Sequence, residues 1–297
     1  MSSPQYSYQT LLSDLSSLSK ESPFFTFSSI GKSLVGRSLP LVIAGKGEKS
    51  VLYVGAHHAM ESLTSLLLIR FLSDYGRAIR RRESRAGIAA ETLFEMRRIF
   101  VVPMLNPDGI ELQQNGADPA NPLTDRLNAM SGGDFRSWQA NGRGVDLNHN
   151  YDAGFDAYKK KEPSLGIYGG GPTRFSGIYP ESEPETAALC SFIRSRDVLL
   201  LLSLHTQGEE IYADYRGHVP PGGVAMAARM AGMSGYRVAE PEGPAASGGL
   251  KDWFILTYDR PGFTLECGKG KNPLPLSDID DVYLRLRDVL FSCPTFL

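Results

Sequence analysis

Four residues that could do chemistry stand where apolar, strand-like runs of the chain end: His58, Glu61, His205 and Glu266. In an open α/β sheet the carboxyl ends of the strands meet at one edge, where ligands bind. We therefore expect the four side chains to share one site. Two imidazoles and one carboxylate with an open fourth position form a set that binds catalytic zinc. The second carboxylate is then available to move a proton.

The spacing within this set favours one metal ion over unrelated polar residues. His58 and Glu61 are three residues apart at a strand-to-helix junction, so both side chains can point at one ion, and His205 comes from a distant strand. A His-x-x-Glu pair alone is common by chance, so the prediction depends on the whole set. His57 adjoins His58 but points elsewhere, and we expect it to be structural.

Alternating strand-like and helix-like segments must position these residues. Apolar runs typical of strands cover 38–45, 50–56, 99–104, 198–205 and 261–266. Apolar spacing typical of helices covers 9–20, 61–75, 183–196 and 278–291. The first two runs flank 46–49, which predicts a hairpin. The Gly-, Asn- and Pro-rich stretch 113–145 predicts a long functional loop. The alternation predicts an α/β fold with a mixed sheet.

Composition limits the class of protein. The 297 residues contain no internal repeat and no dividing linker, which predicts one domain over 1–297. With 31 basic and 33 acidic residues the net charge is −2, which argues against a nucleic-acid or anionic-membrane partner. No apolar run approaches the roughly 20 residues of a membrane span. Three cysteines without a CxxC pair, and a start without a secretory signal, predict a cytoplasmic protein whose oligomeric state the sequence leaves open.

Six short motifs follow one another in the order found in the zinc metallocarboxypeptidases of the carboxypeptidase A superfamily. They are His58-x-x-Glu61, Asn106-Pro107-Asp108-Gly109, Gly144-Val145-Asp146-Leu147-Asn148, Ser182-Glu183-Pro184-Glu185, Ser203-Leu204-His205 and Phe263-Thr264-Leu265-Glu266. Several ordered motifs rarely coincide by chance, so the chain resembles this family over most of its length. The resemblance implies a single α/β domain with a mixed, mainly parallel sheet of about eight strands between helices.

A finer resemblance is to the bacterial γ-D-glutamyl-diamino acid peptidases. These enzymes cleave the bond between the γ-carboxyl of D-glutamate and diaminopimelate in peptidoglycan stem peptides. The stretches that carry the resemblance are 54–62, 144–155, 204–215 and 266–277. The resemblance implies a peptidase whose partner is a small murein peptide, in peptidoglycan turnover or recycling.

The resemblance also implies roles for the candidate residues. One zinc ion per chain would be held by His58, Glu61 and His205, and would acidify water and polarise the scissile carbonyl. Glu266 would be the catalytic general base, which takes a proton from water and passes it to the leaving amine. Asp146 would accept a hydrogen bond from a zinc-binding histidine and fix its tautomer.

Two departures from the family pattern concern substrate binding. Asn148 would bind the carboxylate on the leaving side, but the family arginine that follows it is His149 here. A histidine binds a carboxylate less strongly than a bidentate arginine, so this departure favours an unusual substrate. Gln139 stands at the position of the family's oxyanion arginine, and either Arg136 or Arg143 could reach in instead.

A third departure is a missing family tyrosine. The matching region is Gly243-Pro244-Ala245-Ala246, and three tyrosines could compensate for it: Tyr212, Tyr215 and Tyr258. Each is equally well explained as a packing residue. Strand alternation turns Cys267 away from the face of Glu266, so we expect a buried and inert thiol.

Diaminopimelate carries two carboxylates and a second amine, so its site needs groups of both charges. The candidates for a carboxylate are Arg174, Lys269 and Lys271, and those for the ammonium are Glu210 and Asp214. A solvated surface position explains each of them equally well.

Other functions compete with this one. The same fold could host a broader metallocarboxypeptidase, or a zinc deacylase of the aspartoacylase type that cuts N-acyl amino acids. Such deacylases usually lack the Gly-Val-Asp-Leu-Asn string found here. A non-catalytic peptide-binding module would usually have lost a zinc ligand or the base, whereas all four chemistry-bearing residues are present.

Overall fold

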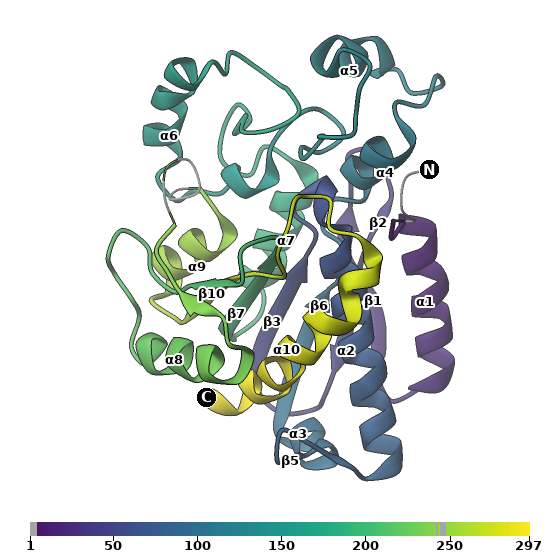
Figure 1. Cartoon of the computed structure of the whole chain (residues 1–297), viewed down its shortest axis with the longest axis vertical. Coiled ribbons are helices and arrows are strands. Elements are labelled where there is room, and N and C mark those ends of the chain that lie inside the picture. Colours follow the sequence, from purple (N-terminus) through teal and green to yellow (C-terminus); the bar gives the residue numbers. More distant parts are fainter. Residues whose placement is uncertain (1–4, 242, 244–247) are drawn as a thin grey trace.

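An eight-stranded mixed sheet forms the centre of the computed structural model, which describes residues 5–241, 243 and 248–297 (Figure 1). Its strands are β1 (Thr26–Lys32), β2 (Ser38–Ala44), β3 (Lys49–Gly55), β6 (Arg97–Val102), β7 (Val198–His205), β8 (Glu210–Tyr212), β9 (Arg237–Val238) and β10 (Gly262–Glu266). Their order across the sheet is β1-β2-β6-β3-β7-β10-β8-β9. The inner strands β6, β3, β7 and β10 are parallel, whereas β1, β2 and β8 join antiparallel. The predicted α/β fold is confirmed.

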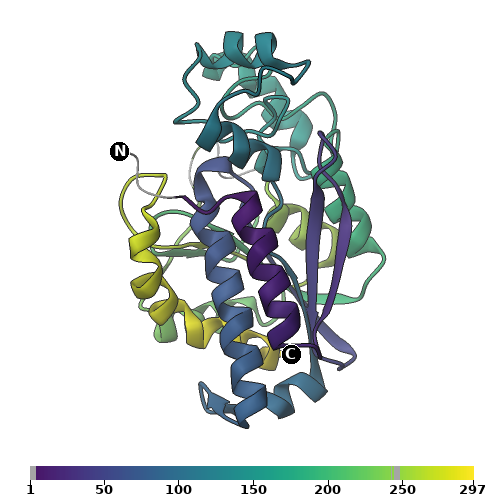
Figure 2. The same ribbon diagram turned by 90° about the vertical axis from the view of Figure 1, so that its right-hand side faces the viewer.

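Helices cover both faces of this sheet. The first face packs against α1 (Tyr8–Glu21), α2 (Ser62–Arg81), α3 (Ala90–Met96), α8 (Gly223–Ser234) and α10 (Ile279–Ser292). The second face packs against α7 (Pro184–Arg194) and α9 (Leu250–Tyr258). Figure 2 shows α1 and α2, in purple and blue, side by side along the first face. The helices predicted over 9–20, 61–75, 183–196 and 278–291 are therefore confirmed.

Strand alternation divides the core into two layers. In β3, Val51 and Tyr53 pack among the helices of the first face, whereas Leu52 and Val54 pack under α7 and α9. Because both faces are covered, the inner strands are apolar at nearly every position. This explains why the sequence shows them as continuous apolar runs.

The hairpin predicted between 38–45 and 50–56 is wrong. β2 pairs antiparallel with β1 and β6, and β6 separates β2 from β3. The connection at 46–49 therefore joins β2 to β3 across β6, a strand about fifty residues further along the sequence. The true partner, β1, is an exposed edge strand with no fully buried residue, so its sequence lacks the apolar signal of a strand.

The stretch 113–145, predicted as a loop, contains helical structure. α4 (Pro107–Asn115) extends into it and α5 (Thr124–Ser131) lies within it, with α6 (Phe155–Lys161) following. Asn106 caps α4, since its side-chain oxygen accepts the N–H of Gly109 at 2.9 Å, and Pro107 occupies the first turn. In Figure 1 these helices gather at one end of the sheet.

Burial of the thiols agrees with the sequence-based expectation. Cys190, Cys267 and Cys293 are free and buried, and Cys267 faces the first core layer. The remaining short strands, β4 (Ser84–Arg85) and β5 (Ile88–Ala89), form a separate pair beyond α2. None of the helices in the described part of the chain is long and apolar enough to cross a membrane.

Candidate metal centre and active site

The junction after β3 places His58 and Glu61. The chain leaves β3 and turns through a short 3₁₀ helix, Ala59–Glu61, directly into α2. Thr64 fixes the turn, because its hydroxyl donates to the carbonyl of Glu61 at 2.7 Å and accepts the N–H of Ala56 at 2.8 Å. Glu61 is buried as a result, whereas His58 stays partly exposed.

Parallel pairing brings the other two residues to the same edge. Leu204 of β7 is the register partner of Gly55 in β3, so the two strands end together. His205, the last residue of β7, is in turn the register partner of Glu266 at the end of β10. Paired residues point to the same face of a sheet, so His205 and Glu266 share one side.

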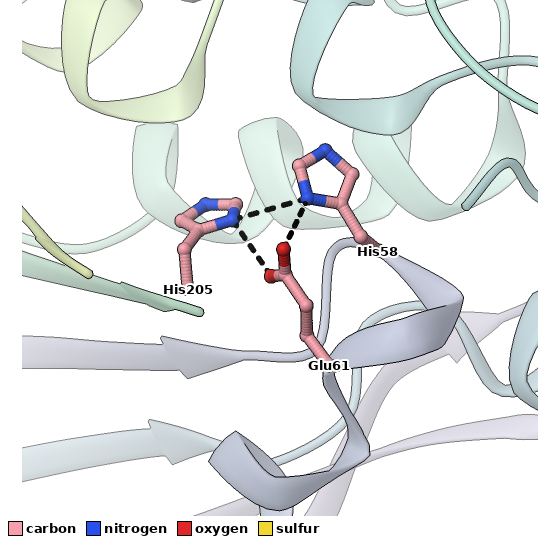
Figure 3. Close-up of side chains that lie close together, drawn as sticks. All are labelled: His58, Glu61 and His205. Atoms are coloured by element: carbon pink, nitrogen blue, oxygen red, sulfur yellow. Dashed lines mark hydrogen bonds and ion pairs between the residues drawn. The ribbon is translucent and has the colours of Figure 1, made fainter. Parts of the chain in front are cut away.

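Three of the four predicted residues converge on one point, as Figure 3 shows. Glu61 bridges the two histidines, with Oε1 2.9 Å from Nδ1 of His58 and Oε2 3.0 Å from Nδ1 of His205. The two Nδ1 atoms lie 3.3 Å apart. One ligand atom from each residue lies within 4.8 Å of the other two, so His58, Glu61 and His205 can hold a metal ion. Two imidazole nitrogens and one carboxylate are donors that suit zinc.

The charges of this cluster strongly perturb its acid–base behaviour. Burial alone would lower the pKa of His58, but the carboxylates of Glu61 and Asp146 outweigh burial and raise that pKa well above 6.5. Burial would likewise raise the pKa of Glu61, but the charges of His58 and His205 lower it to about 2. The site therefore attracts positive charge, which either a proton or a metal ion can supply.

Neighbouring groups hold the outer nitrogen of each imidazole. Asp146 places Oδ1 3.2 Å from Nε2 of His58, and its Oδ2 accepts the N–H of Arg174 at 2.9 Å. Ser203 lies 3.2 Å from Nε2 of His205. Burial would raise the pKa of Asp146, but the charges of His58 and then His149 hold it far below its ordinary value. Both rings are thus oriented with Nδ1 toward Glu61.

Glu266 lies beside this cluster and is half-buried at the end of β10. Its register partners are His205 on one side and Glu210 on the other. Burial is the main cause that raises the pKa of Glu266 to about 8, and the charge of Glu61 adds to it. A carboxylate with a pKa near neutrality can both accept and donate a proton.

Two of the predicted substrate-binding residues border the cluster through Asp146. The N–H of Asn148 donates to Asp146 at 3.2 Å, and its side-chain oxygen accepts the N–H of Leu250 at the start of α9. His149 is buried and its ring stacks on Tyr158, with the centroids 4.2 Å apart.

Gln139 also lies next to Asp146. The Thr173 hydroxyl donates to the side-chain oxygen of Gln139 at 2.5 Å and lies 3.4 Å from Oδ2 of Asp146. The side chain that the sequence predicted at the oxyanion position is therefore near Asp146, the carboxylate that contacts His58.

The two arginines considered for the same task are not brought to this cluster. Arg136 is almost fully exposed and forms a 2.6 Å ion pair with Asp134, two residues away. Arg143 places Nε 3.1 Å from the buried carboxylate of Glu183. Nearby carboxylates thus bind both guanidinium groups, a competition that sequence spacing did not reveal.

Among the three tyrosines, Tyr212 lies closest to the general-base candidate. It faces the same side as Glu266, because it is the register partner of Thr264, and its hydroxyl donates to Glu210 at 2.7 Å. Tyr258 instead packs on Trp253, with the ring centroids 5.8 Å apart. Tyr215 is buried in the second core layer. The region 243–246, where the family tyrosine is missing, lies outside the described residues except for Gly243.

The charged candidates for a diamino acid have different surroundings. Lys269 is exposed and pairs with Glu209 at 2.7 Å, and the side chains of Arg174 and Lys271 are exposed. Glu210 bonds Tyr212 and pairs with Arg237. Asp214 is half-buried beyond β8.

His57 has the structural place expected for it. It is fully buried, its Nε2 lies 2.9 Å from the hydroxyl of Tyr151, and its ring stacks on His205. Burial is the main cause that lowers its pKa well below 6.5, so the ring is neutral. The contact with His205 supports the ring of a candidate metal ligand.

Sequence reasoning assigned no role to two residues that support the site. Ser203 is the single polar residue inside the apolar run 198–204, and its place two positions before His205 is a signal of a shared face. Asn272 joins the loops after β7 and β10, since it donates to the carbonyl of Thr206 at 2.8 Å and accepts from the Thr206 hydroxyl at 2.7 Å. No local pattern signals this long-range contact.

Comparisons with known proteins agree with this geometry. The zinc carboxypeptidase family model matches residues 11–286. A γ-D-glutamyl-L-diamino acid endopeptidase 1 of Lysinibacillus sphaericus is 34% identical over 280 residues, which cover 94% of this chain and 69% of that protein. Solved structures with the same fold include a carboxypeptidase A from Helicoverpa armigera (TM-score 0.74, 20% identity, 98% and 73% of the two chains). Another is a murein-tripeptide amidase from Escherichia coli O157 (TM-score 0.55, 20% identity, 89% and 91% of the two chains). This chain belongs to the zinc carboxypeptidase family.

Proposed function

We propose that this metallopeptidase hydrolyses the amide bond between the γ-carboxyl of D-glutamate and diaminopimelate in peptidoglycan stem peptides. The observation that carries the proposal is the 34% identity, over 94% of the chain, to a γ-D-glutamyl-L-diamino acid endopeptidase. His149, in place of the arginine that follows Asn148 in the family pattern, adds to it, since it favours a leaving group other than an ordinary protein C-terminus.

The proposed mechanism assigns one task to each residue of the cluster. Zinc, held by His58, Glu61 and His205, supplies a Lewis acid when it is bound. Glu266 takes a proton from the attacking water and delivers it to the leaving amine, which its position next to His205 permits. Asp146 keeps the ring of His58 in the orientation that metal binding requires.

Substrate contacts come from residues that surround Asp146. The side-chain oxygen of Gln139 is bound by Thr173, which leaves its amide N–H groups to donate to the scissile carbonyl oxygen as negative charge develops there. Asn148 and His149 face the carboxylate of the leaving residue. An amide and an imidazole bind a carboxylate less tightly than an arginine, which suits a small peptide that is released after each turnover.

An enzyme that recycles murein peptides must be in the compartment that these peptides enter when the cell takes them up. The three buried, unpaired cysteines fit the cytoplasm that the sequence predicted, because thiols stay reduced there. The cytoplasmic location is part of this proposal.

A panel of substrates tests the proposed function. The purified zinc enzyme is expected to release diaminopimelate from L-Ala-γ-D-Glu-meso-diaminopimelate, detected by chromatography of the products. It is expected to leave ordinary C-terminal residues of α-linked peptides and N-acyl amino acids intact. Trimming of the α-linked peptides without cleavage of the γ-linked one would make the chain a broader carboxypeptidase. Cleavage of the N-acyl amino acids alone would make it a deacylase.

Substitution of Asp146 tests whether this carboxylate supports zinc binding. Asp146→Asn is expected to lower zinc affinity by about 10- to 100-fold, the usual effect of removing the carboxylate behind a metal-binding histidine. The affinity is measured by competition with a chromogenic chelator. Asp134→Asn, which changes an exposed aspartate paired with Arg136, is the matched control and should bind zinc like the wild type. Equal zinc affinity in the two variants would show that Asp146 does not support zinc binding.

A further inference from the structure

The backbone of Arg174 is bonded to residues that border the candidate metal centre. Its N–H donates to Oδ2 of Asp146 at 2.9 Å, and its carbonyl accepts the hydroxyl of Tyr158 at 2.9 Å. Two residues earlier, the carbonyl of Pro172 accepts the N–H of Gln139 at 2.8 Å. The arginine side chain therefore starts from a fixed point at the edge of the site.

The backbone conformation of Arg174 is one that favours glycine. Its φ is 67°, in the left-handed region, where the Cβ atom of a non-glycine residue crowds the backbone. Strained residues of this kind persist where the surrounding contacts fix them, and they gather at functional sites. Neither backbone hydrogen bond of Arg174 involves its side chain, so a glycine would form both without strain. The presence of an arginine side chain at this position needs a separate explanation.

The guanidinium of Arg174 is exposed, and no carboxylate in the described part of the chain pairs with it. The two other arginines considered for this site differ in this respect, because Asp134 binds Arg136 and Glu183 lies against Arg143. Arg174 thus combines a fixed backbone next to the site with a guanidinium that is free to bind an anion.

The charge of this guanidinium acts within the site. Burial is the main cause that raises the pKa of Tyr158 above its ordinary value, and the charge of Asp146 adds to it. The charge of Arg174 opposes both and lowers that pKa. Tyr158 itself stacks on His149, with the ring centroids 4.2 Å apart. The free positive charge is therefore close to the residues proposed to bind the substrate.

A γ-linked substrate brings an unpaired anion to this place. When glutamate is linked through its γ-carboxyl, its α-carboxylate stays free on the acyl side of the scissile bond, and an α-linked peptide has no such group there. The proposed function provides Asn148 and His149 for the leaving residue and Gln139 for the scissile carbonyl, but no partner for this α-carboxylate. Thr173, which bonds Gln139 at 2.5 Å, directly precedes Arg174. Arg174 thus adjoins the residue that positions Gln139, on the acyl side.

We propose that Arg174 binds the α-carboxylate of the γ-D-glutamyl residue and thereby selects γ-linked over α-linked substrates. The planar guanidinium matches the two oxygens of a carboxylate with two parallel N–H bonds. The sequence offered Arg174 for a carboxylate of diaminopimelate, whereas the connection through Thr173 to Gln139 favours the acyl side. This inference rests on the proposed function and extends it to the residue on the acyl side of the bond.

Two tripeptides test this contact. L-Ala-γ-D-Glu-meso-diaminopimelate has the α-carboxylate, and its D-isoglutamine analogue has a neutral amide in the same place. Arg174→Gly is expected to lower kcat/KM for the first peptide by about 10-fold, the lower end for a hydrogen bond between charged groups, because the guanidinium is exposed. The kcat/KM of the D-isoglutamine peptide should change by less than about threefold, since it has no α-carboxylate to lose. The wild type should prefer the first peptide by about 10-fold.

Glycine is the suitable replacement because it fits a φ of 67° and keeps both backbone hydrogen bonds. Arg174→Gly should therefore keep the wild-type zinc affinity and should not lower the Tm. Arg174→Lys keeps the charge without the planar fork and should retain part of the preference for the first peptide. Arg82→Gly is the matched control, since Arg82 is also exposed with a φ of 53° but ends α2, a helix about 30 Å long that starts at the metal centre. It should cleave both peptides like the wild type.

The outcomes distinguish this inference from the proposed function. The ratio of the two kcat/KM values within one variant does not depend on how much enzyme is active, so partial misfolding cannot imitate the expected pattern. If Arg174→Gly lowers both peptides by one common factor, the arginine acts on a group that both peptides share, and the α-carboxylate contact is wrong while the proposed function stands. Equal cleavage of the two peptides by the wild type has the same meaning. If the wild type cleaves neither, both proposals are overturned.

Discussion

Glu266→Gln is expected to lower kcat by about 10³-fold, since a positioned general base contributes roughly 10²- to 10⁴-fold. Glutamine has nearly the same shape as glutamate but cannot accept and deliver a proton. The half-buried position of Glu266 at the end of β10 should tolerate the exchange, because a raised pKa means that this position already favours the neutral form. Zinc content, measured by atomic absorption, should therefore stay at one ion per chain, and KM should change little.

A matched control and a clear counter-result accompany this variant. Glu95→Gln makes the same chemical change at an exposed glutamate paired with Lys46, and it should keep wild-type kcat. Wild-type activity in Glu266→Gln would show that another group moves the proton. Loss of zinc together with activity would show that Glu266 supports the metal centre instead.

The inner strands and the metal-binding set could be predicted because their causes are local. A strand covered on both faces must be apolar throughout, and it ends where the first polar residues appear. His58, Glu61, His205 and Glu266 stand at such ends, so the topology of parallel strands brings them together without any further information. The spacing of these residues in the sequence suggested a shared site, and the parallel register of the strands explains how they meet there.

The failures have causes that lie elsewhere in the chain. The false hairpin joined two strands that are adjacent in sequence, whereas the insertion of β6 between them depends on packing across the whole sheet. Arg136 had the right charge to stabilise an oxyanion, but Asp134 captures it on the surface. α8 was missed because its small and flexible residues, Gly, Ala and Met, produce no clear amphipathic pattern.

Lys251 illustrates the same limit. In the sequence it stands beside Asp252, just before the apolar residues of α9, and nothing marks it as buried. Its burial depends on Asp214, 37 residues earlier, and on the docking of α9 against Asn148. A contact assembled from three separate segments has no local signature, and only the folded chain brings it together.

Removal of zinc is expected to abolish activity, and rebinding should become tighter as the pH rises. In the metal-free protein the carboxylates of Glu61 and Asp146 overcome the effect of burial and raise the pKa of His58 well above 6.5. Zinc must therefore displace a proton at neutral pH. One proton released per ion means that affinity increases about tenfold per pH unit, until the pH passes the pKa of His58. Titrations with a competing chelator at pH 6, 7 and 8 measure this slope.

The stability of the metal-free protein should also depend on pH through the pKa of His58. Because the pKa of His58 is higher in the folded than in the unfolded chain, protonation of His58 stabilises the metal-free fold. This stabilisation is complete below the unfolded-state pKa and is lost as the pH rises through the folded-state pKa. Glu266, with a raised pKa of about 8, acts in the same direction. Zinc at 1,000 times its Kd adds about 4 kcal/mol. The Tm difference between the zinc and metal-free proteins should thus widen with pH.

Asp146→Asn offers the decisive comparison for this linkage. It removes one of the two carboxylates that raise the pKa of His58, so the proton is released at lower pH. The pH dependence of zinc affinity should then level off at a lower pH than in the wild type, although the affinity itself is weaker. A wild-type affinity that does not change between pH 6 and 8 would mean that His58 is already neutral. The carboxylates of Glu61 and Asp146 would then hold the rings of His58 and His205 in place without an additional proton on His58.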